Sequence, residues 1–321
     1  IGTYLQEFGW KPKVFTPTGQ PKVDEKILAT VTDIPEAAMI ANYLMLQKRI
    51  AQVQSWLSFL DGDRVHGSVI SNGTITGRMS HRDPNMAQIP SLSSPYGKEC
   101  RACWTVPRGY KLVGVDASGL ELRMLAHYLN DKEFIDDILN GDIHTANQAR
   151  AGLQSRSQAK TFIYAFLYGA GDAKIGQVVG GNKAQGKRVK QSFLNNFPSL
   201  KSFRNRVKRE ADQRGYIKAL DGRKVFIRSS HAALNSLLQS AGAIVMKRAL
   251  VILNNKLLSS DIDAHVVANV HDEWQIETWE NDVDKLGSMA VDSIVEAGVY
   301  YKLKCPMDAE YKIGDNWSDT H

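Results

Sequence analysis

The sequence has few cysteines, no long apolar run and no leader-like start, and each absence argues against a class of protein. Three cysteines among 321 residues (Cys100, Cys103 and Cys305) are too few for a disulfide scaffold and are typical of a reducing compartment. Cys100 and Cys103 have metal-ligand spacing, but no second such pair accompanies them, so we expect free thiols. No apolar run approaches the roughly 18 residues of a membrane-spanning helix, so no membrane partner is expected.

The beginning of the sequence is the next informative absence. The first residues, IGTYLQEFGW, lack the charged-then-apolar order of a signal peptide, and they lack an initiator methionine. We therefore expect the natural chain to have been longer at this end or to have been processed. The composition, 43% hydrophobic and 23% charged, is that of a globular protein of about two domains or one large domain.

The charge is unevenly distributed along the chain. Residues 183–228 hold 14 lysine or arginine residues and three acids, whereas the part from Asp272 onward holds 12 acids and four lysines. The basic block favours a polyanion lying on one surface, although a solvated helical face is the simpler interpretation of charge alone. Aromatic residues lie among these cations, and this combination favours nucleic acid as the polyanion. They are Phe193, Phe197, Phe203 and Tyr216.

Periodicity and turn signals predict a mixed fold with grouped helices and strands. Helices are expected at 33–60, 119–130, 132–139, 154–168 and 231–258, with further helices up to about residue 215. Strands are expected at 111–115, 266–270 and 274–278. Hairpins are expected around Asn72-Gly73, between VHGSVI and TITGRM, and near Asp221-Gly222. Because strands and helices do not strictly alternate, the pattern favours an α+β fold with an antiparallel sheet.

Two aspartates lie at the ends of predicted strands. Asp116 follows the strand 111–115, and Asp272 lies in the turn between 266–270 and 274–278. If both strands belong to one sheet, the two carboxylates can converge and hold Mg²⁺, which prefers hard oxygen ligands. Two such ions can activate a hydroxyl and stabilise a leaving pyrophosphate. From spacing alone, the alternative is that each aspartate caps a turn.

The predicted helix 154–168 carries an ordered row of four side chains. Arg156, Lys160, Tyr164 and Tyr168 recur every fourth residue, so they form one stripe with cations at one end and aromatic rings at the other. A nucleoside triphosphate has the same polarity, with phosphates at one end and a base at the other. The alternative is an amphipathic helix whose tyrosines belong to the core.

Several segments, in this order, resemble the motifs of family A DNA polymerases, the bacterial polymerase I class. They are TGRMSHRDPNMAQIP (76–90), VDASGLELR (115–123), RSQAKTFIYAFLYGAG (156–171), HAALNSLLQSAGA (231–243) and VHDE (270–273). The match runs from about Leu5 to His321. LNGDIHT, AKTFIY and FLYGAG look closest to the replicative polymerases of short-tailed phages.

The resemblance implies an α+β right-hand polymerase fold, with an antiparallel palm sheet, helical fingers and a partial thumb. The implied division is 1–60 partial thumb and thumb base, 61–139 first part of the palm, 140–230 fingers, and 231–321 second part of the palm with VHDE. Family members carry an exonuclease-like domain and the main thumb helices before this point. The chain is therefore expected to be a fragment or to act with a partner that supplies them.

The resemblance also implies roles for particular residues. Asp116 and Asp272, with the Ala117 carbonyl, would hold two Mg²⁺ ions, and Asp116, Asp272 and Lys160 would be catalytic. His144, Arg156 and Lys160 would bind the triphosphate. Tyr164 would pack on the sugar, and Tyr168 would lie near the templating base.

Further residues would select the sugar and contact DNA. Glu121 would fill the space of a ribose 2′-hydroxyl and so exclude ribonucleotides. Contacts with the primer–template DNA would come from Arg78, Asn235, Gln239, His271 and Arg223. Without the resemblance, simpler interpretations hold: Glu121 and Arg78 as surface residues, Asn235 and Gln239 as ordinary helix positions. His144 would then be a capping or core residue and His271 a turn residue.

The implied function is that of a DNA-templated DNA polymerase core, joining a primer 3′-hydroxyl to a dNTP and releasing pyrophosphate. Phage genome replication in the host cell cytoplasm is the expected setting. Expected partners are primer–template DNA, dNTPs, an upstream exonuclease/thumb segment of the same enzyme or a separate chain, and a processivity factor. The alternatives are a single-subunit RNA polymerase, a non-catalytic DNA-binding relic and, last, a metal-dependent nuclease.

Overall fold

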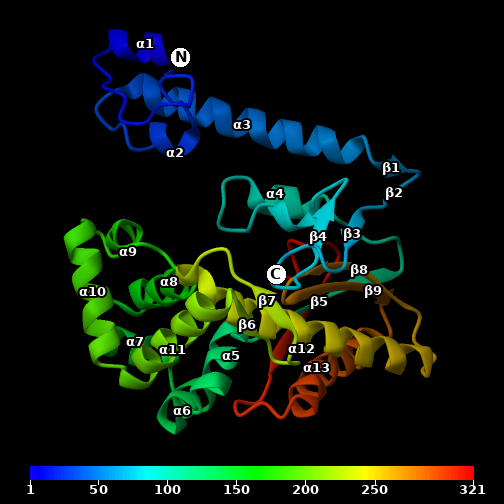
Figure 1. The fold of residues 1–321 in the computed structure, drawn as a ribbon. Helices are drawn as coiled ribbons and strands as arrows, with labels where there is room; N and C mark the ends of the chain where they lie inside the picture. Colours follow the sequence, from blue (N-terminus) through cyan, green and yellow to red (C-terminus); the bar gives the residue numbers. More distant parts are fainter.

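The computed structural model describes residues 1–321, and a four-stranded antiparallel sheet in the order β10–β5–β9–β8 lies at its centre (Figure 1). The strands are β5 (Tyr110–Ala117), β8 (Ala264–Val270), β9 (Glu273–Trp279) and β10 (Ala309–Gly314). The α+β class and the three predicted strands are confirmed. Strand β5 continues through Asp116 instead of ending before it, because Asp116 pairs with Glu273 on one side and Glu310 on the other.

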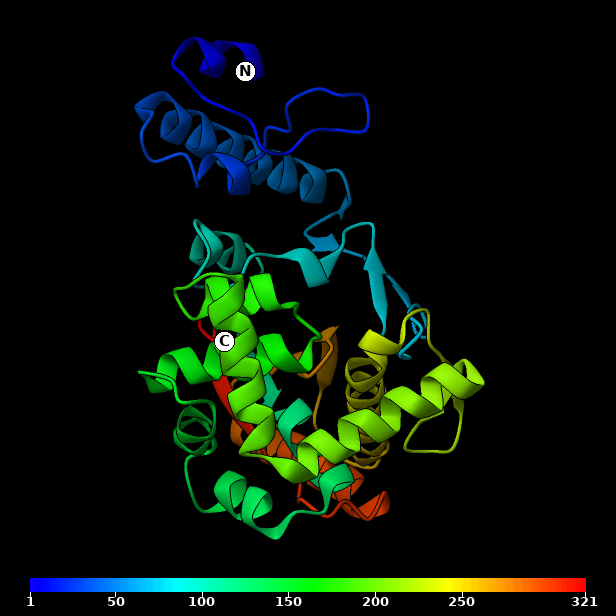
Figure 2. The same cartoon turned by 60° about the vertical axis from the view of Figure 1, so that its left-hand side comes forward.

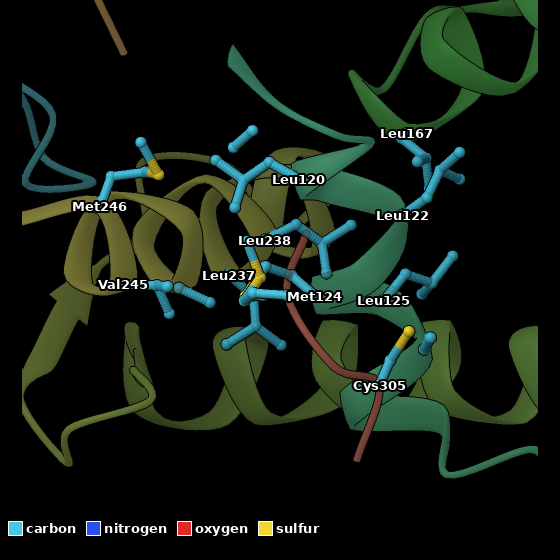
Figure 3. Packing of buried hydrophobic residues seen from close by; sticks show 14 of the residues in the cluster. Leu120, Leu122, Met124, Leu125, Leu167, Leu237, Leu238, Val245, Met246 and Cys305 are labelled. Atoms are coloured by element: carbon cyan, nitrogen blue, oxygen red, sulfur yellow. The ribbon is translucent and has the colours of Figure 1, made fainter. Parts of the chain in front are cut away.

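Three helices build the core against one face of the sheet. They are α5 (Leu120–Leu129), α12 (Ala233–Leu258) and α13 (Val283–Tyr300). Helix α13 packs on β5, β9 and β10, and α12 packs between α13 and α5. Figure 3 shows Leu120 and Met124 of α5 facing Leu237 and Leu238 of α12, and all four are almost completely buried. This core holds β5, and with it Asp116, in place.

Helix α12 is also the most apolar long helix. By length and composition, residues 230–258 could cross a membrane, which the sequence analysis did not anticipate. Of the most apolar 18-residue window, 67% is buried inside the protein. Because α5, α11 and α13 cover it, its apolarity is explained by its place in the core.

Six helices form a second group on one side of the sheet (Figure 2). They are α6 (Lys132–Leu139), α7 (Ile143–Ala151), α8 (Arg156–Leu167), α9 (Asp172–Val178), α10 (Lys183–Asn195) and α11 (Pro198–Arg214). Phe193, Phe197 and Phe203 are buried between these helices. These three rings therefore do not support nucleic-acid binding, contrary to the expectation, because they are core residues in and beside α10 and α11.

The N-terminal region forms a small unit with its own apolar cluster. It contains α1 (Gly2–Glu7), α2 (Glu25–Leu28) and α3 (Pro35–Leu57). Leu5 and Trp10 pack with Leu28, Ile34 and Ala37, apart from the main core. Figure 1 shows α3 extending from this unit toward the sheet, where Trp56 joins Leu112 and Trp317 in a third cluster.

Short elements connect α3 to β5. They are β1 (Leu60–Asp61), β2 (Arg64–Val65), β3 (Ser68–Ile70), β4 (Ser80–Arg82), the 3-10 helix η1 (Met86–Gln88) and α4 (Gly97–Ala102). The hairpin predicted around Asn72-Gly73 forms, but its second strand is β4 and not TITGRM. Ile70 pairs with Ser80, so a nine-residue loop, 71–79, joins the strands. Lys247 of α12 donates to the Ser71 carbonyl, a distant contact that a local turn signal cannot reveal.

The predicted hairpin near Asp221-Gly222 is confirmed. It consists of β6 (Tyr216–Lys218) and β7 (Lys224–Phe226), and the 3-10 helix η2 (Ser230–Ala232) leads from it into α12.

Gly114, in the middle of β5, is closely covered by the C-terminal segment. A Cβ at this position would lie 2.5 Å from the Thr320 carbonyl oxygen and 2.7 Å from Gln275 Nε2. We expect Gly114→Ala to lower the free energy of unfolding by about 1–3 kcal/mol, because backbone and a buried amide must move. Denaturant unfolding measures this. Gly67→Ala, whose Cβ would meet only ordinary contacts at 3.6 Å or more, is the control, and equal losses in both variants would contradict the packing argument.

Candidate active site

Two aspartates meet at one end of the central sheet. Asp116 lies opposite Glu273 in the register of β5 with β9. Asp272 comes directly before Glu273, in the two-residue turn from β8 to β9, and its carbonyl accepts a hydrogen bond from Ala117 N at 3.0 Å. The antiparallel pairing therefore brings Asp116 and Asp272 side by side, as predicted if their strands shared a sheet.

The other residue of that turn is His271. Its φ of 63° is in the left-handed region, which lets the chain reverse direction within two residues. Its ring is half-buried, and its Nδ1 atom has no hydrogen-bond partner. Burial, with the nearby charge of Arg78, lowers the pKa of His271, so the ring is neutral at physiological pH.

Both carboxyl groups have a raised proton affinity. Partial burial and the adjacent charge of Asp272 raise the pKa of Asp116 to about 7, although the Asp116 side chain keeps one side open to solvent. Burial and the charge of Glu121 raise the pKa of Asp272 to about 6. Neither aspartate has an ion pair with a lysine or arginine, so the site has uncompensated negative charge when both are ionised.

Glu273, which the sequence analysis did not single out, is a buried acid next to this pair, and its charge adds to the raised pKa values of both aspartates. Burial opposes its ionisation, but hydrogen bonds from His321, Trp317 and Gln275 keep its pKa below the usual value. A fourth partner is Arg101, whose Nη1 atom lies 3.7 Å from the Glu273 carboxylate. In the sequence, the only local sign of a role for Glu273 is its position next to Asp272. Three of its partners, Arg101, Trp317 and His321, come from distant segments of the chain.

The donor set fits hard divalent cations. No third histidine, cysteine or acid joins the two aspartates closely enough to complete an all-side-chain cage. Such an arrangement suits Mg²⁺, which keeps waters and shares its coordination with substrate phosphates. The Ala117 carbonyl follows Asp116 directly in β5 and stays a predicted third ligand. The two neighbouring carboxylates have raised pKa values, and their negative charge when ionised is what bound cations would neutralise.

Helix α8 carries the predicted nucleotide-binding stripe. Ser155 caps the helix by accepting from Gln158 N, which makes Arg156 the first helical residue. Lys160 is exposed and forms no ion pair. Tyr164 is half-buried, and its ring centroid lies 6.5 Å from that of Tyr168 at the C-terminal end. The stripe is therefore accessible along its length, with cations and rings at opposite ends.

Helix α7 adds His144 to the cationic end of the stripe. The His144 ring lies 6.3 Å from the Tyr164 ring, and burial together with Arg156 and Lys160 lowers its pKa. Asp142 caps α7 through the amide of His144 and also binds Arg156 Nε at 2.5 Å. A phosphate bound by Arg156 would have to compete with Asp142 for the guanidinium.

Glu121 links three elements around the site. It is buried, with 6% exposure, and accepts hydrogen bonds from Arg78 Nη2 at 2.7 Å and from the Tyr168 hydroxyl at 3.1 Å. These bonds join α5 to the loop 71–79 and to the end of α8. The interpretation of Glu121 and Arg78 as surface residues is therefore wrong. Glu121 and Arg78 are 43 residues apart in the sequence, so their contact is beyond the range of local patterns.

The remaining predicted DNA contacts lie on α12 and in the β6–β7 turn. Asn235 and Gln239 are half-buried, one turn apart on α12, and make no side-chain hydrogen bond within the protein. Arg223, in the β6–β7 turn, is paired with Asp221 at 2.6 Å. Its Nη1 atom is 3.8 Å from the position of a Cβ on Gly77, next to Arg78. The roles of these residues stay predictions.

A cavity lies apart from this constellation. It has a volume of about 640 Å³ and lies between the end of α3, the β3–β4 pair and β8. None of the predicted site residues lines it. At the candidate active site, Asp116, Lys160 and Tyr168 are exposed to solvent.

Paired carboxylates at the end of an antiparallel sheet, beside a helix with cations and tyrosines, define the class of right-hand polymerase folds. A family model described as DNA polymerase family A matches residues 2–319, so the chain belongs to that family. The predicted family and right-hand fold are confirmed. Family A polymerases use divalent metal ions, in agreement with the donor set.

Individual relatives agree with this assignment. The chain is 42% identical to the DNA-directed DNA polymerases of Enterobacteria phage T3 and Escherichia phage T7, over 99% of this chain and 51% of each relative. It is 28% identical to DNA polymerase I of Pseudomonas aeruginosa over 95% of this chain and 36% of that protein. The chain thus spans about half the length of the phage relatives it matches.

A solved structure shares the fold. It is the POL domain of Pol1 from M. smegmatis in complex with DNA primer-template and dNTP, with a TM-score of 0.86 and 21% identity. The match covers 99% of this chain and 61% of that chain.

The raised pKa values of the aspartates predict that cation binding releases protons. Near pH 6.5 the pair shares about one proton, which Mg²⁺ must displace, whereas near pH 8.5 both groups are already ionised. We expect Mg²⁺ affinity to rise about tenfold from pH 6 to pH 7 and to level off above pH 8. Titration calorimetry in two buffers of different ionisation enthalpy measures both quantities. Asp261→Asn, at an exposed position, should leave the profile unchanged, and a wild-type affinity independent of pH would contradict the prediction.

Proposed function

We propose that residues 1–321 are the polymerising portion of a DNA-templated DNA polymerase that adds dNTPs to a primer 3′-hydroxyl and releases pyrophosphate. The observation that carries the proposal is the placement of Asp116 and Asp272 next to each other, beside the α8 stripe. The family assignment and the phage relatives support it. Replication of a phage genome in the host cytoplasm is the proposed setting.

The carboxylates would hold two Mg²⁺ ions together with the Ala117 carbonyl. Bound there, the ions would lower the pKa of the primer hydroxyl and neutralise charge on the leaving pyrophosphate. The protein contributes position: β5 and the β8–β9 turn fix both aspartates on a rigid sheet. The neighbouring Glu273 carboxylate is held in one position by His321 and Trp317.

Helix α8 would bind the incoming nucleotide. Arg156, Lys160 and His144 would contact the triphosphate, with Lys160 neutralising charge that develops during transfer. Tyr164 would pack on the sugar, and Tyr168 would lie near the templating base. Glu121, buried and held by Arg78 and Tyr168, would occupy the space of a 2′-hydroxyl.

The proposed division of the chain follows its packing. The separate N-terminal cluster supports 1–60 as partial thumb and thumb base, and the helices α7–α11 with the β6–β7 hairpin support 140–230 as fingers. Residues 61–139 and 231–321 would be the two parts of the palm. Arg78, Asn235, Gln239, His271 and Arg223 would contact the primer–template.

Further partners are also part of the proposal. Because the chain spans about half the length of its phage relatives, an exonuclease and thumb portion would come from the same enzyme or a separate chain, and a processivity factor could act with it.

Primer extension tests the proposal. The chain is expected to extend a labelled primer–template by one nucleotide with Mg²⁺ and the complementary dNTP. Asp116→Asn should lower the rate at least about 1000-fold, because the cations contribute several kcal/mol to transition-state stabilisation.

The matched control is Asp292→Asn, at an exposed position of α13, which should retain full activity. If the wild-type chain is inactive, the N-terminal half of a phage relative is added. Recovery of Asp116-dependent extension supports the proposal, and no recovery would contradict it.

Glu121 supplies the test of sugar selection. We expect Glu121→Ala to lower the kcat/KM preference for dNTP over rNTP by at least about tenfold, since the space for a 2′-hydroxyl opens. Activity with dNTP should also fall, because Arg78 and Tyr168 lose their acceptor. Glu121→Gln, which keeps the volume, should retain most of the preference. A wild-type chain that prefers rNTP would instead favour an RNA polymerase.

A further inference from the structure

The β6–β7 hairpin presents an outward face made only of aromatic and cationic side chains. Ile217 and Val225, at its centre, are each 2% exposed and belong to the main core. Successive residues of a strand point to opposite faces, so the strand neighbours of these two point outward. The outward residues are Tyr216, Lys218, Lys224 and Phe226.

Phe226 is the most exposed phenylalanine of the chain, with 67% of its surface accessible. It lies opposite Tyr216 in the hairpin register, and the two rings are 6.1 Å apart in an edge-on arrangement. Lys224 Nζ lies 4.8 Å above the Tyr216 ring. Tyr216 thus contacts Phe226 edge-on within the outward face, while most of the Phe226 side chain stays accessible.

The charge around these rings is positive. Lys218 and Lys224 lie opposite each other, are exposed, and form no ion pair with an acid. The nearest acid in the hairpin, Asp221, is in the turn and is already bound by Arg223. Like charges placed opposite each other destabilise a two-stranded hairpin, so the pair is a cost to the fold that a bound polyanion would remove.

The hairpin lies next to the candidate active site. Both of its strands contact α12, the helix that carries Asn235 and Gln239 (Figure 1). Arg223 in its turn approaches Gly77 in the loop 71–79, directly beside Arg78. A DNA strand that contacts Arg78 and α12 can therefore reach the hairpin without leaving the protein surface.

We propose that the outward face of the β6–β7 hairpin is a binding site for single-stranded DNA, with Phe226 stacking on an unpaired base and Lys218 and Lys224 contacting phosphates. The inference rests on the proposed function, in which the unpaired DNA is the template strand. An exposed ring beside unpaired cations is the combination that binds single strands. A duplex would use the lysines but not Phe226, because its bases are already stacked on one another.

Binding to two DNA probes separates these possibilities. Fluorescence anisotropy with the full chain, in EDTA, measures the affinity for a labelled 12-nucleotide oligothymidine and for a blunt 16-base-pair duplex. Phe226→Ala should weaken binding of the single strand about 5- to 150-fold, the range for loss of one base–aromatic stack. Binding of the blunt duplex should change less than twofold. Phe226→Trp should restore the single-strand affinity.

The salt dependence of the single-strand affinity tests the proposed phosphate contacts of the two lysines. Lys218→Gln and Lys224→Gln should each lower the slope of log affinity against log salt by about 0.7 for the single strand. The matched control is Phe15→Ala, which removes a ring of similar exposure (54%) from the N-terminal region and should change neither affinity.

Three outcomes would overturn the inference. Unchanged single-strand affinity in Phe226→Ala would leave only phosphate contacts at the hairpin. Equal weakening for both probes, or a lowered melting temperature, would indicate a structural role for the ring. Failure of Phe226→Trp to restore binding would exclude stacking. Because binding is measured without metal, the inference can fail while primer extension succeeds, and a chain without polymerase activity can still satisfy it.

Discussion

The register of β5 against β9 is the constraint on which the rest of the site depends. It places Asp116 opposite Glu273 and so beside Asp272, two carboxylates that repel each other and that carry raised pKa values. The sheet tolerates this pair because its strands are anchored elsewhere, by the core of α5, α12 and α13. The site is therefore organised before any cation or nucleotide arrives, and such preorganisation is the main contribution a protein makes to phosphoryl transfer.

The aspartate pair differs from the buried acids of the protein in its partners. Glu121 is bound by Arg78, Glu277 by Arg64, and Glu273 by His321 near Arg101. These three acids have cationic partners within the protein, as burial of charge requires. Asp116 and Asp272 have none. The two aspartates at the end of the sheet, close to Tyr164 of α8, therefore keep negative charge that a cation from solution can neutralise.

Sequence patterns predicted most of the framework but only part of the site. Strands 111–115, 266–270 and 274–278 were recognisable as apolar runs beside turns, and the α8 stripe followed from helical spacing. The length of the loop 71–79 was missed, and one of its contacts comes from Lys247, far away in sequence. The rings of Phe193, Phe197 and Phe203 were misread because composition does not tell a core face from a surface. Burial of Glu121 and the partners of Glu273 depend on contacts between distant segments, which no local pattern encodes.

The long separation between paired strands has a consequence for synthesis. Asp116 in β5 leaves the ribosome more than 150 residues before its partner strand β9, and β10 follows later still. At about 5–20 residues per second, β5 waits roughly 10–30 s as an apolar strand with two unpaired edges. Helices α5 to α11 can form meanwhile, but the two aspartates cannot meet. Translation that stops early therefore yields a chain with a folded helical part, no metal site and an exposed strand prone to aggregation.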